Sequence, residues 1–297
     1  MHCNSILRKY ALLLVIPMFL YSACTPVADG NLTNSDDNGG YASDASRIEW
    51  INDDIISLGD AAALVYNGAY MRTTKTTIDG TCATVATDTS SVGLHTLIIR
   101  FGESGIGGIN NPTDCNCLDG RKRRGSIIIQ YAGHYFDSGT IHTFTFSNYF
   151  INDIQVSGTI KTIIADTTVY GNHHYSVYAS DSINMSQDPK QSQYIVWNGT
   201  FDRKWISGAS TASRNDDGFL ISGNATITRA NGHQFSFAIS SPLQVYMNCN
   251  YIESGIVTVS SSQGQSPRII NYGSGGCDAS ASVSINGVSV YNFTLTP

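Results

Sequence analysis

Glutamate is scarce in this sequence, and so are charged side chains in general. Only three glutamates occur in 297 residues, and Asp, Glu, Lys and Arg together make up 13% of the chain. Low charge combined with many Ser and Thr residues suits strands that have one solvated face better than it suits helices. The composition therefore predicts a mainly β protein.

Positive charge is also in short supply. The chain has 17 basic and 23 acidic residues, for a net charge of −6. Removal of an N-terminal signal that carries Arg8 and Lys9 would take away two positive charges and leave −8. Nucleic-acid binding draws on positive charge, so we expect no nucleic-acid partner.

The motifs of common enzymes and metal sites are missing. The sequence has no Gly-x-Ser-x-Gly elbow, and no Ser, His and Asp are spaced so as to suggest a triad. Cys115-x-Cys117 lacks the second cysteine pair or histidine pair that a zinc site requires. We therefore predict no catalytic residues, no metal ligands and no cofactor.

The clearest signal that is present lies at the N-terminus. Arg8 and Lys9 precede the apolar run YALLLVIPMFLY, which ends in Ser-Ala-Cys at Cys24. This pattern predicts a signal peptide over residues 1–23 and resembles the lipobox of bacterial lipoproteins, in which the cysteine receives palmitate and other acyl chains. The alternative is ordinary secretion, with Cys24 an incidental neighbour of the cleavage site.

No second apolar run is long enough to span a bilayer, so the predicted anchor is lipid alone. A lipid on Cys24 would place the protein in the cell envelope, attached to a membrane that we expect to be the outer membrane. Whether it faces the periplasm or the cell surface is left open.

Five cysteines follow the predicted lipidation site: Cys82, Cys115, Cys117, Cys249 and Cys277. An exported protein is in a compartment that permits disulfides, and an odd number leaves one thiol over. Cys249 and Cys277 flank adjacent predicted strands and form the favoured pair. Cys82 is expected to pair with Cys115 or with Cys117.

The chain after Cys24 divides into a tether and one domain. Residues 24–43 lack hydrophobic periodicity and predict a flexible tether. Residues 44–297 are expected to form a single β-rich domain that begins with one amphipathic helix over 46–67. Ser46 and Glu49 fit a capping box at the start of that helix.

From about residue 74 onward the pattern is one of strands and tight turns. Residues 154–164 alternate so that Ile154, Val156, Ile160 and Ile164 share one face. Asn-Gly or Asp-Gly pairs at 79–80, 119–120, 231–232 and 286–287 predict hairpin turns of type I′. Short connections favour an antiparallel meander of about 11 to 13 strands, either a sandwich or a strongly curved sheet.

The stretch DCNCLDGRKRRGSIII (114–129) is the part of the sequence that most resembles a binding site. The Asp119-Gly120 pair predicts a hairpin whose second strand begins with charged residues. An anion-binding patch and a metal site are the alternatives. Strand alternation divides the basic residues between two faces, with Arg121 and Arg123 on one and Lys122 and Arg124 on the other.

Arg121 and Arg123 lie in line with Ile127, Ile129 and Tyr131, which suggests that they face the interior. We expect them to pair with acidic residues such as Asp114 or Asp137. This arrangement predicts a structural role for the stretch.

Aromatic residues gather in YIVWNGTFDRKWISG (194–208), where Trp197 and Trp205 fall on one face of a predicted strand. The favoured interpretation is a stripe of core residues, since aromatic side chains dominate sheet packing. The functional alternative is a platform on which Trp197 and Trp205 stack against the rings of a glycan.

Four segments together resemble a group of exported lipoproteins from the Bacteroidota, about 300 residues long, that has no assigned reaction. They are CLDGRKRRGSIII (117–129), NYFINDIQVSGT (148–159), NGTFDRKWISG (198–208) and CDASASVSINGVSVY (277–291). The resemblance implies an exported, lipid-anchored β protein. It implies no catalytic residue.

The predicted function is that of a non-catalytic, lipid-anchored envelope protein that binds a ligand or partner or has a structural role. The expected partners are the membrane, through the N-terminal lipid, and either a glycan or another envelope protein. The first alternative is a surface glycan-binding accessory protein, and the second is an envelope hydrolase.

Overall fold

The computed structural model describes residues 40–68, 76–78, 81–88, 93–102, 114–167, 173–185, 193–211 and 213–295, which belong to one compact unit. The predicted signal peptide, Cys24, the first Asn-Gly or Asp-Gly pair at 79–80 and most of the predicted tether lie outside the described residues. Among the described residues, no helix is long and apolar enough to cross a membrane.

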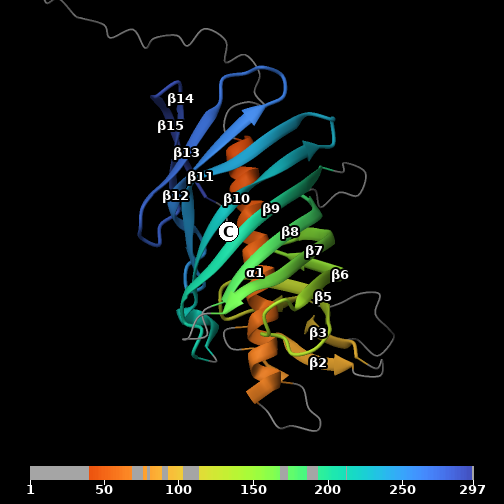
Figure 1. Cartoon of the computed structure of the whole chain (residues 1–297). Helices are drawn as coiled ribbons and strands as arrows, with labels where there is room; N and C mark the ends of the chain where they lie inside the picture. The colour runs from red at the N-terminus through yellow and green to blue at the C-terminus, as the bar shows by residue number, and fades with distance from the viewer. Residues whose placement is uncertain are drawn as a thin grey trace, which may run out of the picture. The chain divides into compact units, whose positions relative to one another are not determined.

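The protein is mainly β, as predicted, and all its described strands belong to one open antiparallel sheet (Figure 1). The strands are β1 (Thr76–Thr77), β2 (Thr84–Asp88), β3 (His95–Phe101), β4 (Cys115–Asn116), β5 (Lys122–Tyr131), β6 (Ile141–Ile151), β7 (Ile154–Thr167), β8 (His173–Asn184), β9 (Tyr194–Ser207), β10 (Gly218–Arg229), β11 (Gln234–Tyr246), β12 (Ile252–Ser261), β13 (Arg268–Ser274), β14 (Ser280–Ile285) and β15 (Val288–Thr294). Two further elements are the helix α1 (Gly40–Gly68) and the short 3-10 helix η1 (Arg214–Asp216).

The sheet is a meander in which each strand pairs with the strands next to it along the chain, except that β3 pairs with β5 and the short β4 pairs only with β5. Of the two predicted arrangements, the described residues therefore form the curved sheet and not the sandwich. Fifteen strands are present where 11 to 13 were predicted, partly because β1 and β4 are only two residues long.

The predicted turns differ in their geometry. Asn286 and Gly287 both have positive φ, 52° and 77°, as a type I′ turn requires. At the Asp119-Gly120 pair only Gly120 has positive φ, 80°, and its N–H donates to the carbonyl of Cys117. The hairpin at 117–121 is therefore confirmed, but its turn is not of type I′.

The helix begins six residues before its predicted start, so the capping box is wrong. Ser46 lies inside α1, where its hydroxyl bonds to the carbonyl of Ala42 (2.7 Å) and meets the hydroxyl of Tyr272 (2.6 Å). Glu49 is buried instead of reaching back to a cap. The predicted boundary between tether and domain at residue 43 is wrong for the same reason, because residues 40–43 are helical.

Both the apolar and the polar side of the helix are enclosed, because every residue from 51 to 63 is buried. Its polar side has contacts with β5, β8 and β9, and its first turns contact β10 and β13. Figure 1 shows α1 (orange) behind the strands β7 to β10, which cross it. A sheet that covers both the apolar and the polar side of one helix explains why a single apolar stripe was an incomplete prediction.

The helix packs tightly against the sheet at Gly59. A Cβ atom at this position would lie 2.6 Å from Cε1 of Phe144 and 2.9 Å from Cδ1 of Ile129. Any larger residue would push the helix away from β5 and β6, so glycine sets the depth at which α1 sits in the core. The predicted inward face of β7, which includes Ile154 and Ile160, is confirmed as buried.

Candidate functional site

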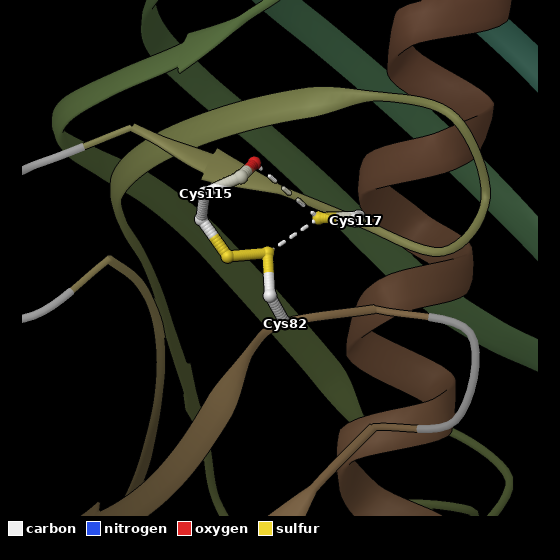
Figure 2. A group of neighbouring side chains, drawn as sticks. All are labelled: Cys82, Cys115 and Cys117. Atoms are coloured by element: carbon white, nitrogen blue, oxygen red, sulfur yellow. Dashed lines mark hydrogen bonds between the residues drawn. A yellow bond between two sulfur atoms is a disulfide. The ribbon is translucent and has the colours of Figure 1, made fainter.

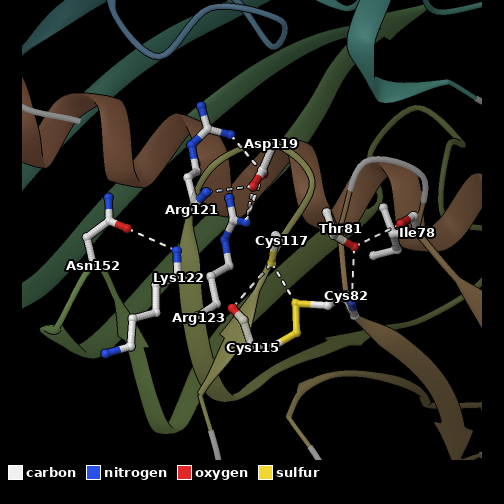
Figure 3. Close-up of a disulfide and its surroundings, with 11 residues drawn as sticks. Ile78, Thr81, Cys82, Cys115, Cys117, Asp119, Arg121, Lys122, Arg123 and Asn152 are labelled. Carbon is white, nitrogen blue, oxygen red and sulfur yellow. Dashed lines mark hydrogen bonds and ion pairs between the residues drawn. A yellow bond between two sulfur atoms is a disulfide. The ribbon is translucent and has the colours of Figure 1, made fainter.

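The inward side of the β4–β5 hairpin carries two buried arginines, Arg121 before β5 and Arg123 on it, that meet the helix. Arg123 Nη2 lies 2.9 Å from Asp54 Oδ2, and Arg121 Nη1 lies 3.2 Å from Asp54 Oδ1. Arg214 from η1 donates to the same Asp54 carboxylate. Both β5-side arginines also reach Asp119 in the turn, at 3.0 Å and 2.8 Å (Figure 3). One helical carboxylate is thus shared by three guanidinium groups.

The predicted partners of the inward arginines are wrong. Asp114 pairs with Lys122 (2.8 Å) and Arg124 (3.1 Å) on the outer face, and Asp137 is bonded to His134 (3.1 Å). The strand pleat explains the difference, because Asp114 is exposed on the outer side while the inner side of β5 faces the helix. The predicted division of the four basic residues between two faces is confirmed.

Electrostatics keep the Asp54 network ionised. Burial alone would raise the pKa of Asp54, but Arg123, Arg214 and Arg121 together hold that pKa well below its usual range. Burial lowers the pKa of Arg121 to about 10, although Asp54 opposes this effect. Asp54, Arg121 and Arg123 therefore remain charged near neutral pH, as an internal ion-pair network requires.

A second buried network surrounds Arg203 on β9. Its guanidinium bonds to Asp53 and, at 3.2 Å, to Asp60, both on the helix. The hydroxyl of Tyr175 donates to Asp60 over 3.1 Å. Burial raises the pKa of Asp60 to about 6, against the opposing charge of Arg203. Burial also raises the pKa of Asp217, to about 8.

Two further interior carboxyls have no arginine beside them. Burial raises the pKa of Glu49 to about 8, with the charges of Asp53 and Asp181 acting in the same direction. Burial raises the pKa of Asp181 to about 7, and Asn52 donates to this residue over 3.5 Å. These groups change protonation near neutral pH, which in an open cleft would mark an active site.

The interior carboxyls are nevertheless closed off from solvent. Glu49, Asp53, Asp60, Asp181 and Asp217 are each no more than 4% exposed. The hollows that described residues line are bordered by other side chains. Proton transfer to a substrate requires hydrogen-bond reach, and none of these three hollows is lined by one of the interior carboxyls.

Three cysteines meet beside the β4–β5 hairpin (Figure 2). Cys82, just before β2, forms a disulfide with Cys115 of β4, with the two Cα atoms 6.2 Å apart. Cys117, in the turn, is a buried free thiol whose Sγ lies 2.7 Å from Sγ of Cys82. Of the two predicted partners for Cys82, the structure has Cys115, and Cys117 is the thiol left over.

The favoured cysteine pair, Cys249 and Cys277, is joined in a disulfide with a Cα–Cα distance of 5.5 Å. Two groups of donor atoms lie within 4.8 Å of one another, Cys82 with Cys115 and Cys117, and Cys249 with Glu253 and Cys277. A metal binds thiolates, and disulfide sulfurs are not thiolates. Each group therefore offers one ligand, Cys117 or Glu253, which does not make a metal site.

The stacking platform predicted at Trp197 and Trp205 is wrong. The two residues are 0% and 1% exposed, because this side of β9 faces the interior. Trp197 stacks against Phe201 with ring centroids 5.9 Å apart, and Trp205 packs against Phe219 at 5.4 Å. Both tryptophans are core residues, which was the favoured interpretation of the pattern.

A solvent-facing hollow of about 470 Å³ lies among the C-terminal strands. The ladder between β13 and β14 ends at the pair Asn271 and Ser282, beyond which the two strands separate. The lining is mostly polar and consists of Glu253, Asn271, Tyr272, Gly273, Ser274, Gly275, Asp278, Ser280, Ala281, Ser282, Asn292, Phe293 and Thr294. Its volume falls within the range of about 300 to 1,000 Å³ that is typical of ligand pockets.

Sequence reasoning did not find the acidic side of the helix as a feature. Its signal was present, since Asp53, Asp54 and Asp60 are concentrated in the one predicted helix of a chain with little charge. No family model matches the chain, and no curated protein and no solved structure matches it.

Proposed function

We propose that this protein is a lipid-anchored component of a bacterial cell envelope, attached to the outer membrane through Cys24, that binds a partner or has a structural role and is not an enzyme. The run from Arg8 to Cys24 supports the anchor, because an export signal that ends in Ala-Cys is typical of lipoproteins. The likeness to exported lipoproteins of the Bacteroidota supports the same assignment.

One observation carries the non-catalytic part of the proposal. The carboxyls whose pKa burial raises towards neutrality, Glu49, Asp60, Asp181 and Asp217, are buried in the interior. Arg203 acts as a counter-ion for Asp60, and Arg203 and Arg214 act on Asp217, whereas Glu49 and Asp181 owe their raised pKa to burial. Interior charges of this kind are a means of fixing how one element sits on another.

The anchor is tested by metabolic labelling with palmitate. We expect the wild type to incorporate label and Cys24→Ala to incorporate none, because the thiol of Cys24 is the proposed attachment site. Cys277→Ala serves as a matched control, since it removes a cysteine of the folded domain and leaves the signal intact. Equal labelling of wild type and Cys24→Ala would refute the anchor.

Glycan binding is a second candidate function, favoured by the hollow among β12 to β15. Carboxylates and amides such as Asp278, Asn271 and Asn292 can hydrogen-bond to sugar hydroxyls, and the partly exposed ring of Phe293 offers a surface for stacking. This location replaces the one predicted at the two buried tryptophans.

A glycan array tests the second candidate. We expect Asp278→Ala with Asn292→Ala to lower binding at least about tenfold, which corresponds to about 1.4 kcal/mol. Asn224→Ala, an exposed position on β10, is the matched control and should leave binding unchanged. Wild-type protein that binds no glycan, or equal binding by both variants, would rule this function out.

A further inference from the structure

The three cysteines beside the β4–β5 hairpin have a use that neither proposed function includes. Figure 2 shows Sγ of Cys82 between the sulfurs of Cys115 and Cys117. One of these sulfurs is bonded to Cys82, and the other lies 2.7 Å away as a free thiol. Thiol–disulfide exchange proceeds by attack of a thiolate on a disulfide sulfur, so the nucleophile, the central sulfur and the leaving group are already together.

We propose that Cys82, Cys115 and Cys117 form an internal thiol–disulfide exchange site. Cys117 loses its proton and its thiolate attacks Sγ of Cys82. The new bond joins Cys117 to Cys82 while the bond between Cys82 and Cys115 breaks, and the electron pair of that bond leaves on Cys115, which takes up a proton. No net oxidation occurs, and no other reactant is consumed.

The two disulfide isomers are close in chain entropy. The bond from Cys82 to Cys115 spans 33 residues, and a bond from Cys82 to Cys117 would span 35. Because the entropy of loop closure depends on the logarithm of loop length, this difference has almost no effect. The balance between the isomers is therefore set by the surroundings of the thiol that is left free.

Those surroundings include positive charge. Burial works against the charge on Arg123, but Asp54, Tyr149, Asp119 and Cys117 together raise the pKa of Arg123 well above its usual value. Cys117 thus lies near enough to this guanidinium to interact with it electrostatically.

The exchange changes which cysteine carries the free thiol, from the buried Cys117 to the more exposed Cys115. Cys117 is 6% exposed, whereas Cys115 is partly exposed and lies between the exposed residues Asp114 and Asn116. In the first isomer the free thiol is sheltered, and in the second it is offered to solvent. The site would make the reactivity of this edge of the sheet depend on which isomer is populated.

Trapping with iodoacetamide tests the exchange. The native full chain is alkylated at about pH 8.5, then denatured and digested, and the position of the alkyl group and the disulfide partner of Cys82 are read by tandem mass spectrometry. Exchange predicts two products, one alkylated at Cys117 with Cys82 bonded to Cys115, and one alkylated at Cys115 with Cys82 bonded to Cys117. Labelling at Cys115 should slow down at about pH 6.5, because less thiolate is present.

Two variants make the result decisive. Cys115→Ser should form the bond between Cys82 and Cys117, and Cys117→Ser should keep the bond to Cys115 and show no alkylation in this cluster. Alkylation of the wild type at Cys117 alone, or two free thiols in Cys115→Ser, would overturn the proposal. Bonds from Cys82 to Cys249 or Cys277 would reveal scrambling in unfolded chains and would also overturn it.

Discussion

Four consecutive basic residues occupy two different electrostatic environments. The inward pair, Arg121 and Arg123, is 1% and 0% exposed and meets Asp54, which is 0% exposed. The outward pair, Lys122 and Arg124, is 37% and 22% exposed and meets Asp114 and Asp153 at the surface. Inside, a lost partner leaves a buried charge uncompensated, whereas outside water replaces the partner. The same type of ion pair is therefore expected to contribute very differently to stability on the inner and outer sides of this segment.

The largest expected effect comes from the shared carboxylate. Asp54→Asn would leave Asp119 as the only carboxylate of the described residues that pairs with the three buried guanidinium groups, and we expect a loss of roughly 3–5 kcal/mol or a failure to fold. The measurement is a urea titration followed by circular dichroism. Asp153→Asn, the matched surface change, should cost less than about 1 kcal/mol. Equal losses in the two variants would remove the distinction between the faces.

Replacement of one arginine on each face should give a smaller contrast. Arg123→Met leaves Asp54 with Arg121 and Arg214, so we expect a loss of roughly 2–3 kcal/mol, less than for removal of the carboxylate itself. Arg124→Met should change the free energy of unfolding by less than about 1 kcal/mol. An Arg123→Met variant as stable as the wild type would show that the buried pair is dispensable.

Interior carboxyls without an arginine should respond to pH in the opposite direction from Asp54. The folded pKa of Glu49 is about 8, above its ordinary value of 4.5, so folded protein binds more protons in this window and stability falls as pH rises from about 4.5 to about 8. Asp181 acts in the same direction. Burial lowers the pKa of His142 to about 4, which opposes this trend only below about pH 6.5.

Glu49→Gln isolates this contribution. Each pKa unit corresponds to about 1.4 kcal/mol, so the variant should show a visibly flatter decline in free energy of unfolding between about pH 6.5 and about pH 8. Urea titrations at several pH values provide the measurement. A decline as steep as that of the wild type would mean that Glu49 is not the group that titrates.

Added salt should weaken only the ion pairs on the outer face. Lys122→Ala removes contacts with Asp114 and Asp153 that lie at the surface, and we expect a small loss of stability that fades further as salt is added. Thermal unfolding at low and high ionic strength provides the measurement. A loss that is large and independent of salt would place these contacts in the same class as the interior ones.

The inward or outward direction of each side chain on β5 could be predicted from the sequence, whereas the residues that pair with these side chains could not. Alternation assigns Arg123 to the inner face because side-chain direction repeats every two residues. Its partner Asp54 lies 69 residues earlier in the chain, and no local rule links the two. The start of the helix was predicted wrongly because serine is a common N-cap residue. The hydroxyl of Ser46 instead hydrogen-bonds with the hydroxyl of Tyr272, which is distant in the sequence.

The same contrast between local pattern and distant contacts applies to the disulfides and the aromatic residues. Cys249 and Cys277 could be paired because both flank neighbouring strands of a meander, a local property of the predicted topology. Which of Cys115 and Cys117 joins Cys82 depends on side-chain positions two residues apart, a distinction that spacing does not make. The burial of Trp197 and Trp205 depends on what covers the inner face of β9, and this is the helix.

Hydrogen exchange of the α1 amides is the most direct test of the central claim that the sheet encloses a charged helix. The structure buries every residue from 51 to 63, so these amides should exchange only through global unfolding, as slowly as those of the central strands β7 to β9. Exchange of these helical amides orders of magnitude faster than in those strands would contradict the enclosed helix and the interior role of its carboxyls.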